Sequence, residues 1–309
     1  MPSEQLTDLW EIRACFQNNF RRSPCFIVSE HGDEIVGLLP LSRIEEDASY
    51  AFFPGETWNG HTWLEQNRII SASNQVLQDM LDAIPGQYHL RYLLPTNSGG
   101  QGAKIIDEVG YLFCPGQYDY DMEKYFGVFS HKSAKRIRRD IASLAEKQLQ
   151  FRYDDLNDFD EMVRLNIERF GENSYYFDPR FQRSFRDLMH YLDKTGRLRM
   201  TGVVIAGKTA AVDMGAIYNG TYTLLAGGTN AAFPGVAKLI NTHHMQRACI
   251  ERIEAVDFLC GNFSWKTMFH LSPRPLYMFT NIPQAVTVPA DTVMPLMEKS
   301  RMRRSAYAG

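Results

Sequence analysis

The chain is organised around residues 198–266, where apolar runs alternate with short turns. The three apolar runs cover residues 198–206, 209–218 and 221–228. They are separated by Gly207-Lys208 and by Asn219-Gly220, and because Asn and Gly tolerate the positive φ angles of two-residue hairpin turns, they predict a three-stranded antiparallel meander. Apolar positions after Gly235 predict a helix to about residue 253, and residues 255–259 predict a short buried strand.

The N-terminal part of the chain shows a related pattern. Residues 4–20 have the spacing of an amphipathic helix, and two apolar runs, 25–30 and 35–41, flank a polar turn. A Phe-Pro-Gly sequence follows the hairpin in both parts, as Phe53-Pro54-Gly55 and as Phe233-Pro234-Gly235. This weak internal repeat predicts two copies of one unit, with chance similarity of short motifs as the alternative.

Composition narrows the class of protein. A length of 309 residues is enough for two domains, and 44% hydrophobic with 22% charged residues is typical of a globular protein. The net charge of -3 gives no overall attraction to nucleic acid or membranes. Five scattered cysteines indicate neither a disulfide framework nor a metal site. With no signal-type apolar core and no run of the ~18–20 apolar residues of a membrane helix, we expect a cytoplasmic protein without a membrane span.

Four short motifs occur in an informative order: Gly37-Leu38-Leu39-Pro40-Leu41, Ser133-Ala134-Lys135-Arg136-Ile137-Arg138-Arg139, Pro234-Gly235, and Asp257-Phe258-Leu259-Cys260-Gly261-Asn262-Phe263-Ser264-Trp265-Lys266. In this order they resemble the BcsL/CelD-like acetyltransferases of the GNAT superfamily, a group named for cellulose biosynthesis and related to the FemABX aminoacyl transferases. The resemblance covers about residues 20–285 and implies an α/β fold of the α+β type. It implies tandem GNAT-like lobes, each a mixed, mostly antiparallel sheet flanked by helices.

The resemblance also implies how the chain is divided. Residues 1–125 would form a degenerate N-terminal lobe, in which Glu56 directly follows Pro54-Gly55 and would repel a phosphate. Residues 126–285 would form the lobe with the donor site, and residues 286–309 a C-terminal tail. In the donor lobe, the last meander strand and the strand at 255–259 would be parallel neighbours that splay apart around the thioester arm of acyl-CoA.

The Pro234-Gly235 turn is the expected site for the pyrophosphate of this acyl-CoA co-substrate. A helix N-terminus offers free backbone N–H groups and a positive dipole end, and glycine permits close approach. Gly235 and Ala237 fit the GNAT pattern, whereas Ala232 stands where the pattern has Gln or Arg. A simple loop-to-helix junction is the alternative. The residues expected to bind the donor are Ala226, Gly227, Gly228, Gly235, Val236, Ala237 and Lys238.

Two features of this expected donor site have a physical reason. The backbone at 226–228 would hold pantetheine and polarise the acyl carbonyl. Lys238 opposes the helix dipole in the first turn, which a bound anion would explain.

Candidate catalytic groups are few. Asp213 lies in the middle of an apolar strand and is either a base with a raised pKa or a buried structural carboxylate. By the resemblance, Lys266 would contact the phosphate or the oxyanion, with an exposed surface lysine as the alternative. The adjacent His243 and His244 cannot share a helix face, so we expect one in the core and one in solvent. The glycine-rich loop 97–102 lacks the Gly-Lys-Ser/Thr of a P-loop.

Candidate acceptor-binding residues are basic or aromatic. The segment 130–140 predicts a helix with Lys132, Arg136 and Arg139 near one face. That face is either solvated or binds an anion, such as a phosphorylated acceptor or the 3′-phosphate of CoA. Trp58 and Tyr176 belong to aromatic loops that either line an acceptor pocket or pack internally.

The favoured function is N-acyl transfer from acyl-CoA to an amine on an amino sugar, amino acid or peptide, without a metal. The first alternative is a Fem-like transferase that uses aminoacyl-tRNA, which the acidic net charge disfavours because tRNA binding needs a wide basic surface. The second is a catalytically degenerate GNAT protein that only binds a partner. The sequence leaves the acceptor and the oligomeric state open.

Overall fold

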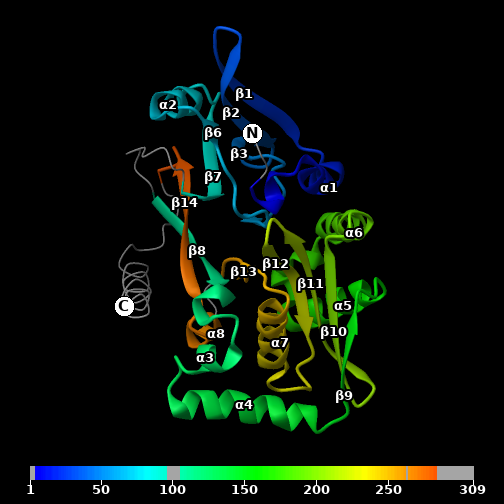
Figure 1. Ribbon diagram of the computed structural model, residues 1–309. Coiled ribbons are helices and arrows are strands. Elements are labelled where there is room, and N and C mark those ends of the chain that lie inside the picture. Colours follow the sequence, from blue (N-terminus) through cyan, green and yellow to red (C-terminus); the bar gives the residue numbers. More distant parts are fainter. Residues whose placement is uncertain (1–3, 96–104, 262–263, 284–309) are drawn as a thin grey trace, which may run out of the picture. The chain divides into compact units, whose positions relative to one another are not determined.

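Apolar runs separated by glycine turns form antiparallel strands in both parts of the chain (Figure 1). The structure, a computed structural model, describes residues 4–95, 105–261 and 264–283. The chain folds into two units: the first is Met1–Gly110 with Pro273–Gly309, and the second is Tyr111–Ser272.

The chain returns to the first unit because strand β14, Ser272–Thr280, pairs antiparallel with β7, Gln87–Leu93, of that unit. The lobe boundary expected at residue 125 stays a prediction. The expected tail, residues 286–309, and the loop 97–102 lie outside the described residues.

The sheet of the first unit begins with a meander in which β1, β2 and β3 pair antiparallel. After helix α2, strand β7 pairs in parallel with β3, with Ser49 opposite Gln87. β14 lies between β7 and β8. The bounds are β1 Ser23–His31, β2 Glu34–Ile44, β3 Ser49–Phe52, α2 Asn74–Asp82 and β8 Ile105–Phe113. The remaining elements are η1 Leu6–Asp8, α1 Trp10–Phe20, β4 Thr57–Trp58, β5 His61–Thr62 and β6 Ile70–Ser71.

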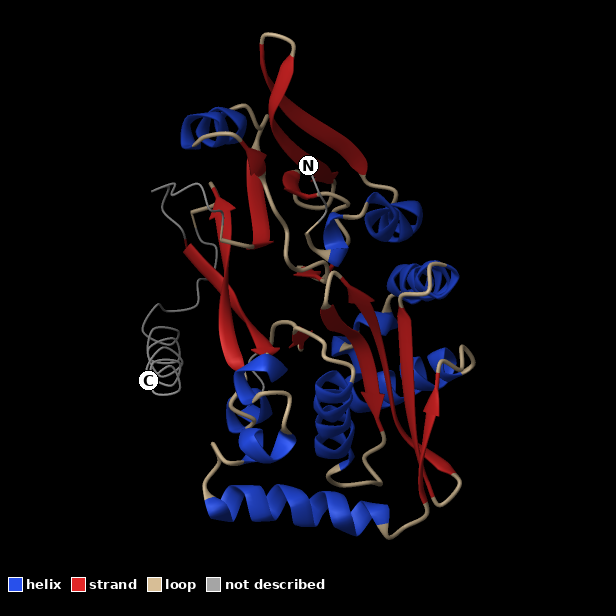
Figure 2. Cartoon of the chain, in the orientation of Figure 1, coloured by secondary structure: helices blue, strands red, loops and turns tan. Residues whose placement is uncertain are grey.

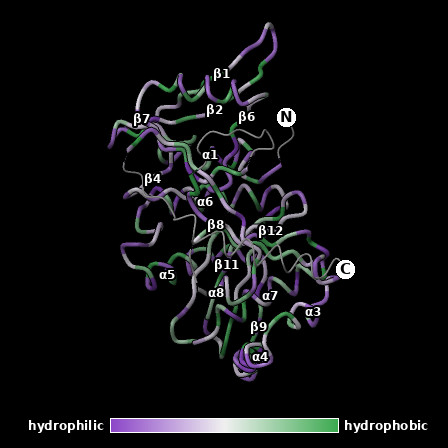
Figure 3. Tube along the Cα trace, turned by 90° about the vertical axis from the view of Figure 1, so that its left-hand side faces the viewer, coloured by the Kyte–Doolittle hydropathy of each residue, from purple (hydrophilic) through white to green (hydrophobic). Residues whose placement is uncertain are grey.

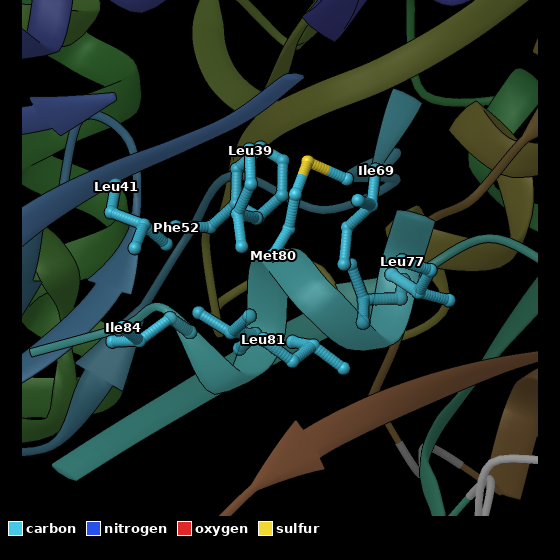
Figure 4. Close-up of a cluster of buried hydrophobic side chains, with 10 residues drawn as sticks. Leu39, Leu41, Phe52, Ile69, Leu77, Met80, Leu81 and Ile84 are labelled. Atoms are coloured by element: carbon cyan, nitrogen blue, oxygen red, sulfur yellow. The ribbon is translucent and has the colours of Figure 1, made fainter. Parts of the chain in front are cut away.

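The apolar side of α2 forms the core of this unit. Its Leu77, Met80 and Leu81 are buried in one cluster with Leu39 and Leu41 of β2 (Figure 4). The helix begins at a side-chain cap, because the Ser73 hydroxyl accepts a hydrogen bond from the Val76 amide.

The sheet of the second unit contains the predicted meander, because β10, β11 and β12 pair antiparallel in sequence order. β9 pairs with β10 on one side. On the other side, β13 pairs in parallel with β12, which confirms the expectation of parallel neighbours. The bounds are β9 Leu149–Tyr153, β10 Leu198–Ile205, β11 Lys208–Tyr218, β12 Thr221–Thr229 and β13 Ala255–Asp257.

Helices cover both faces of these strands (Figure 2). Helix α7, Val236–Ile250, contacts β11 and β12 from one face, and α5, Asp158–Phe170, contacts the same strands from the other. The remaining helices are η2 Pro115–Tyr118, α3 Met122–Phe126, α4 His131–Ala145, η3 Gly171–Asn173, η4 Tyr175–Phe177, α6 Pro179–Lys194 and α8 Ser264–Met268.

The two units have the same strand order. In each, a three-stranded meander is followed by a helix, then by a fourth strand parallel to the third, then by an antiparallel neighbour. In the second unit this neighbour is the end of β8, with Phe113 opposite Val256. The predicted internal repeat is therefore confirmed by the strand pairing, and the fold is a mixed α/β fold with mainly antiparallel strands flanked by helices.

Candidate active site

Strand β12 pairs with β13 only over the first residues of β12. The paired residues run from Thr221 opposite Ala255 to Thr223 opposite Asp257, where β13 ends. β12 continues to Thr229 and carries a bulge at Leu225, because the register with β11 shifts between Met214 and Gly215. The backbone at 224–229 thus runs on beyond its pairing with β13, which is the arrangement expected for strands that splay around a donor arm.

The N-terminus of α7 lacks a side-chain cap. Its N-cap residue is Gly235, with φ +92°, a left-handed conformation that glycine adopts without strain. The Val236 amide donates to the Phe233 carbonyl. The Lys238 amide donates to the Gly235 carbonyl, so the amides of this turn are partly satisfied by the backbone. No side chain caps the start of α7 by a hydrogen bond, and the positive end of the helix dipole lies there.

Helix α4 packs against this end of α7. Lys238 Nζ donates to Asp140 Oδ2 at 2.6 Å, and this hydrogen bond lowers the pKa of Asp140. The position of Lys238 at the start of the helix predicts a bound anion, but the Asp140 carboxylate already neutralises the charge of Lys238. Asp140 also lies 3.4 Å from Arg139, so the three side chains together carry one net positive charge.

Helix α4 is amphipathic, and most of its residues are hydrophilic, as the colouring in Figure 3 shows. Lys132, Arg136 and Arg139 are exposed, while Ile137 and Leu144 are buried. Arg136 approaches Met268 of α8, with 3.6 Å between Nη2 and Sδ. The predicted basic helix thus exists, and its Arg139 end adjoins the uncapped start of α7.

Asp213 belongs to a buried polar network. Its Oδ2 lies 3.0 Å from His244 Nε2, and His244 Nδ1 lies 3.3 Å from the Tyr222 hydroxyl. With an ionised carboxylate, Nε2 carries the proton and Nδ1 accepts from the hydroxyl. Burial and the nearby Asp213 raise the pKa of Tyr222. His244 is 2% exposed and His243 is half-buried, so only the core half of the expectation for the histidine pair is met.

The two glycines of β12 have close neighbours on opposite faces. A Cβ on Gly227 would lie 2.1 Å from Asp213 Oδ1, and a Cβ on Gly228 would lie 2.5 Å from the Met162 carbonyl of α5. The Gly227 carbonyl also accepts a hydrogen bond from Asn166 Nδ2 at 2.6 Å. Neither position has room for a side chain, and Asn166 competes with any ligand of the Gly227 carbonyl.

Lys266 is buried, so the alternative of an exposed surface lysine is wrong. The residue is 2% exposed, and its ammonium donates to the carbonyls of Phe258, Leu259 and Cys260, the first two at 2.9 Å. These residues form the turn directly after β13, where Leu259 has φ +54°. Lys266 thus places a positive charge at the end of β13 and holds the turn there.

Residues 131–267 match the family model described as an acetyltransferase (GNAT) domain. The matched stretch is 137 residues long, less than half of the 309-residue chain. No curated protein matches the sequence significantly.

Solved structures share the fold across nearly the whole chain. FemX is 10% identical, with a TM-score of 0.60 over 96% of this chain and 95% of FemX. A conserved protein of unknown function from Bacteroides thetaiotaomicron is 12% identical, with a TM-score of 0.57 over 87% and 90% of the two chains. L-PGS from Bacillus licheniformis is 10% identical, with a TM-score of 0.56 over 97% and 99%. At such identities the likeness concerns the fold alone.

The matched residues 131–267 include most of the predicted site residues. Ala226, Val236 and Ala237 lie on the bulged part of β12 and in the first turn of α7, as expected. Tyr176 is buried against Phe185 of α6, with 5.2 Å between ring centres, so its hydroxyphenyl ring is part of the interior. Trp58 is half-buried in the β4–β5 hairpin of the first unit.

Three residues of this region were not among the predicted site residues. Asn166 and Asp140 lie on helices far from β12 and α7 in sequence, and nothing in their local pattern signals their contacts. For His244, the sequence predicts only that one residue of the adjacent histidine pair lies in the core.

Neither a membrane span nor a metal site is found in the described residues. None of their helices is long and apolar enough to cross a bilayer, and no three His, Cys, Asp or Glu side chains are grouped for metal binding.

Proposed function

We propose that this chain is a cytoplasmic N-acyltransferase of the BcsL/CelD-like group, which transfers an acyl group from acyl-CoA to an amine. The amine nitrogen attacks the thioester carbonyl, a C–N bond forms, the C–S bond breaks and CoA leaves as the thiolate. The amine loses one proton to a base. Asp213, held by His244, is the proposed base, and Lys266 is proposed to position the turn after β13.

One observation carries this proposal. The backbone of β12 runs on past its last residue paired with β13, and the same unit contains a helix whose N-cap, Gly235, has no side-chain hydrogen bond. An unpaired strand edge can hold an extended pantetheine arm by hydrogen bonds, and an uncapped helix N-terminus can hold a pyrophosphate. In the first unit, Ser73 caps the corresponding helix, which supports a single donor site.

The experiment is isothermal titration of the full chain with acetyl-CoA and with a longer acyl-CoA, beside Gly235→Glu. The new carboxylate would meet the pyrophosphate at the start of α7, so we expect micromolar binding to weaken at least ten-fold, about 1.4 kcal/mol. Gly207→Glu is the matched control. Gly207 also has a positive φ, +75°, and its Cβ would meet nothing within 4 Å, so backbone strain and added charge are similar.

Binding that survives in Gly207→Glu and is lost in Gly235→Glu supports the donor site. Equal affinity in all three proteins would refute it. No heat with any acyl-CoA would direct the work to the second candidate.

The second candidate is a Fem-like transferase whose donor is aminoacyl-tRNA. It is favoured by the exposed Lys132, Arg136 and Arg139 of α4, whose Arg139 end adjoins the start of α7. Phosphate contacts release counterions, so tRNA binding through this face would weaken steeply with salt. Replacing the three side chains by Gln would flatten that salt dependence, whereas acyl-CoA binding at Gly235 alone would change little.

A further inference from the structure

The sheet face under the second half of α7 is polar. Across β10 and β11, Arg199 is opposite Gly215 and Thr201 is opposite Asp213, and across β11 and β12, Ile217 is opposite Tyr222. Side chains two residues apart in a strand point to the same face. Arg199, Thr201, Asp213 and Tyr222 therefore share one face, and Asp213 contacts His244 of α7 there.

The same face is apolar under the first half of α7. Val203 and Ala211 of the strands form a buried cluster with Val236, Leu239 and Ile240 of the helix. This contrast is not needed for packing, because an apolar core would serve under both halves. Buried polar groups cost free energy unless they are hydrogen-bonded, so a polar half-core points to a binding role.

A cavity of about 270 Å³ opens at this polar half. Its floor contains Thr201, Tyr222 and His244, each at most 6% exposed. The ring of Tyr222 lies where a side chain on Gly215 would be, because a Cβ there would be 2.5 Å from Tyr222 Cε2. The volume is near the lower end of the range of about 300–1,000 Å³ for ligand pockets, so it suits a small molecule.

Two opposite charges line this cavity without an ion-pair partner. Arg199 donates to the Leu198 carbonyl, and no carboxylate in the described part of the chain lies within 4.0 Å of its guanidinium. Asp154 accepts from the Met200 amide and has no cation within the same distance among those residues.

The other ionisable side chains of the cavity are accounted for. Arg247 pairs with Glu251, and His244 with Asp213. His243 is stacked on Phe151, and its Nε2 lies 3.1 Å from the hydroxyl of Tyr153, which also lines the cavity. Burial together with the neighbouring His244 and Arg247 lowers the pKa of His243 to about 4. His243 is therefore uncharged near neutral pH, and Arg199 is the cation available for a ligand.

We propose that this cavity binds a free amino acid, with its carboxylate on Arg199 and its ammonium group on Asp154. A guanidinium binds a carboxylate through two parallel N–H donors. The single negative charge of the Asp154 carboxylate balances the single positive charge of the ligand's ammonium group. A dianion such as inorganic phosphate would meet Asp154 and is disfavoured. The site lies at the second half of α7, whereas Gly235 begins the helix, so the inference does not depend on the donor.

The test uses the full chain. Thermal unfolding is measured with each proteinogenic amino acid at millimolar concentration, and the best one is titrated calorimetrically beside its C-terminal amide and its N-acetyl derivative. We expect the amino acid to raise the melting temperature, and both derivatives to bind at least ten-fold more weakly. Inorganic phosphate is titrated as the competing anion.

Variants assign the two ends of the ligand. Arg199→Gln should weaken binding at least ten-fold, and Asp154→Asn should weaken the amino acid but not its N-acetyl derivative. Arg164→Gln, which removes an exposed guanidinium of α5, is the control and should bind as the wild type does. Gly235→Glu should also leave this binding unchanged, which separates the site from the donor site.

The proposal is overturned if no amino acid stabilises the chain, if the amide and N-acetyl derivative bind as tightly as the amino acid, or if phosphate binds more tightly. The comparison of derivatives uses the wild-type chain, so it decides the matter even where Arg199→Gln fails to fold.

Discussion

Lys266 offers the sharpest test of how this fold positions its candidate site. Its buried ammonium donates to three carbonyls of the turn after β13. Lys266→Met keeps a similar length and apolar stem but removes the three donors. We expect the free energy of unfolding to fall, because buried carbonyls then lose a charged donor.

The magnitude follows from the individual carbonyls. Leu259 also accepts from the Tyr111 amide at 3.2 Å, so its carbonyl keeps a donor. The loss therefore falls mainly on Phe258 and Cys260, at about 1–3 kcal/mol each, or roughly 2–6 kcal/mol in total. Removing the ammonium also removes its desolvation cost, which favours the lower half of this range, about 2–4 kcal/mol.

The assay is equilibrium urea unfolding, followed by donor titration of the folded variant. If Lys266 positions the turn after β13, Lys266→Met should lower the free energy of unfolding strongly. Donor binding or activity should then fall because the turn is disturbed. A direct role in chemistry predicts the opposite pattern. If Lys266→Met unfolds within about 1 kcal/mol of the wild type yet abolishes turnover, the reasoning from the three carbonyls is refuted.

Two further predictions concern the polar side of α7. Gly227→Ala places a Cβ against Asp213 Oδ1, so we expect a loss of about 1–3 kcal/mol in urea unfolding, and almost none in an Asp213→Ala background; an equal loss in both would contradict the contact. The lowered pKa of His243 means that the unfolded chain binds more protons between about pH 6.5 and 4, so stability falls as the pH falls through that window. His243→Gln should flatten this dependence of the urea midpoint on pH, and an unchanged slope would assign it to other groups.

The elements that the sequence predicts well are those set by local chemistry. Asn219 and Gly220 both have positive φ in the turn between β11 and β12, as the sequence predicts. The turn between β10 and β11 is Ala206-Gly207 instead of the predicted Gly207-Lys208, because Lys208 already pairs with Ile205, and Ala206 has φ +49° there. The start of α7 at Gly235 and the amphipathic α4 have equally local causes.

The contacts that the sequence does not predict are between distant residues. Lys238 lies in the first turn of α7, where the helix dipole disfavours a positive charge. Only the packing of α4 on α7 brings the Asp140 carboxylate beside it. Lys266 sits in a short polar helix, and nothing local shows that its ammonium turns inward. Strand β14 likewise joins the first unit through pairing with β7, which is distant in sequence.

The two Phe-Pro-Gly sequences show how one motif yields two different structures. Gly55 and Gly235 both have positive φ, but Gly55 leads into the β4–β5 hairpin, whereas Gly235 leads directly into α7. Glu56 is 2% exposed, and this burial raises its pKa. Its carboxylate accepts hydrogen bonds from the Trp63 and Leu64 amides and so holds the segment after the hairpin.

The helix of the first copy, α2, begins only after Ser73, whose hydroxyl accepts a hydrogen bond from the Val76 amide in its first turn. The helix of the first copy thus begins after a hairpin and with a side-chain cap, whereas the helix of the second copy begins without one. Because Ser73→Gly would remove the cap without creating the glycine turn, it should cost only a few tenths of a kcal/mol in stability. It should not create a second binding event in the acyl-CoA titration, and a second event would show that the cap alone keeps the first copy closed.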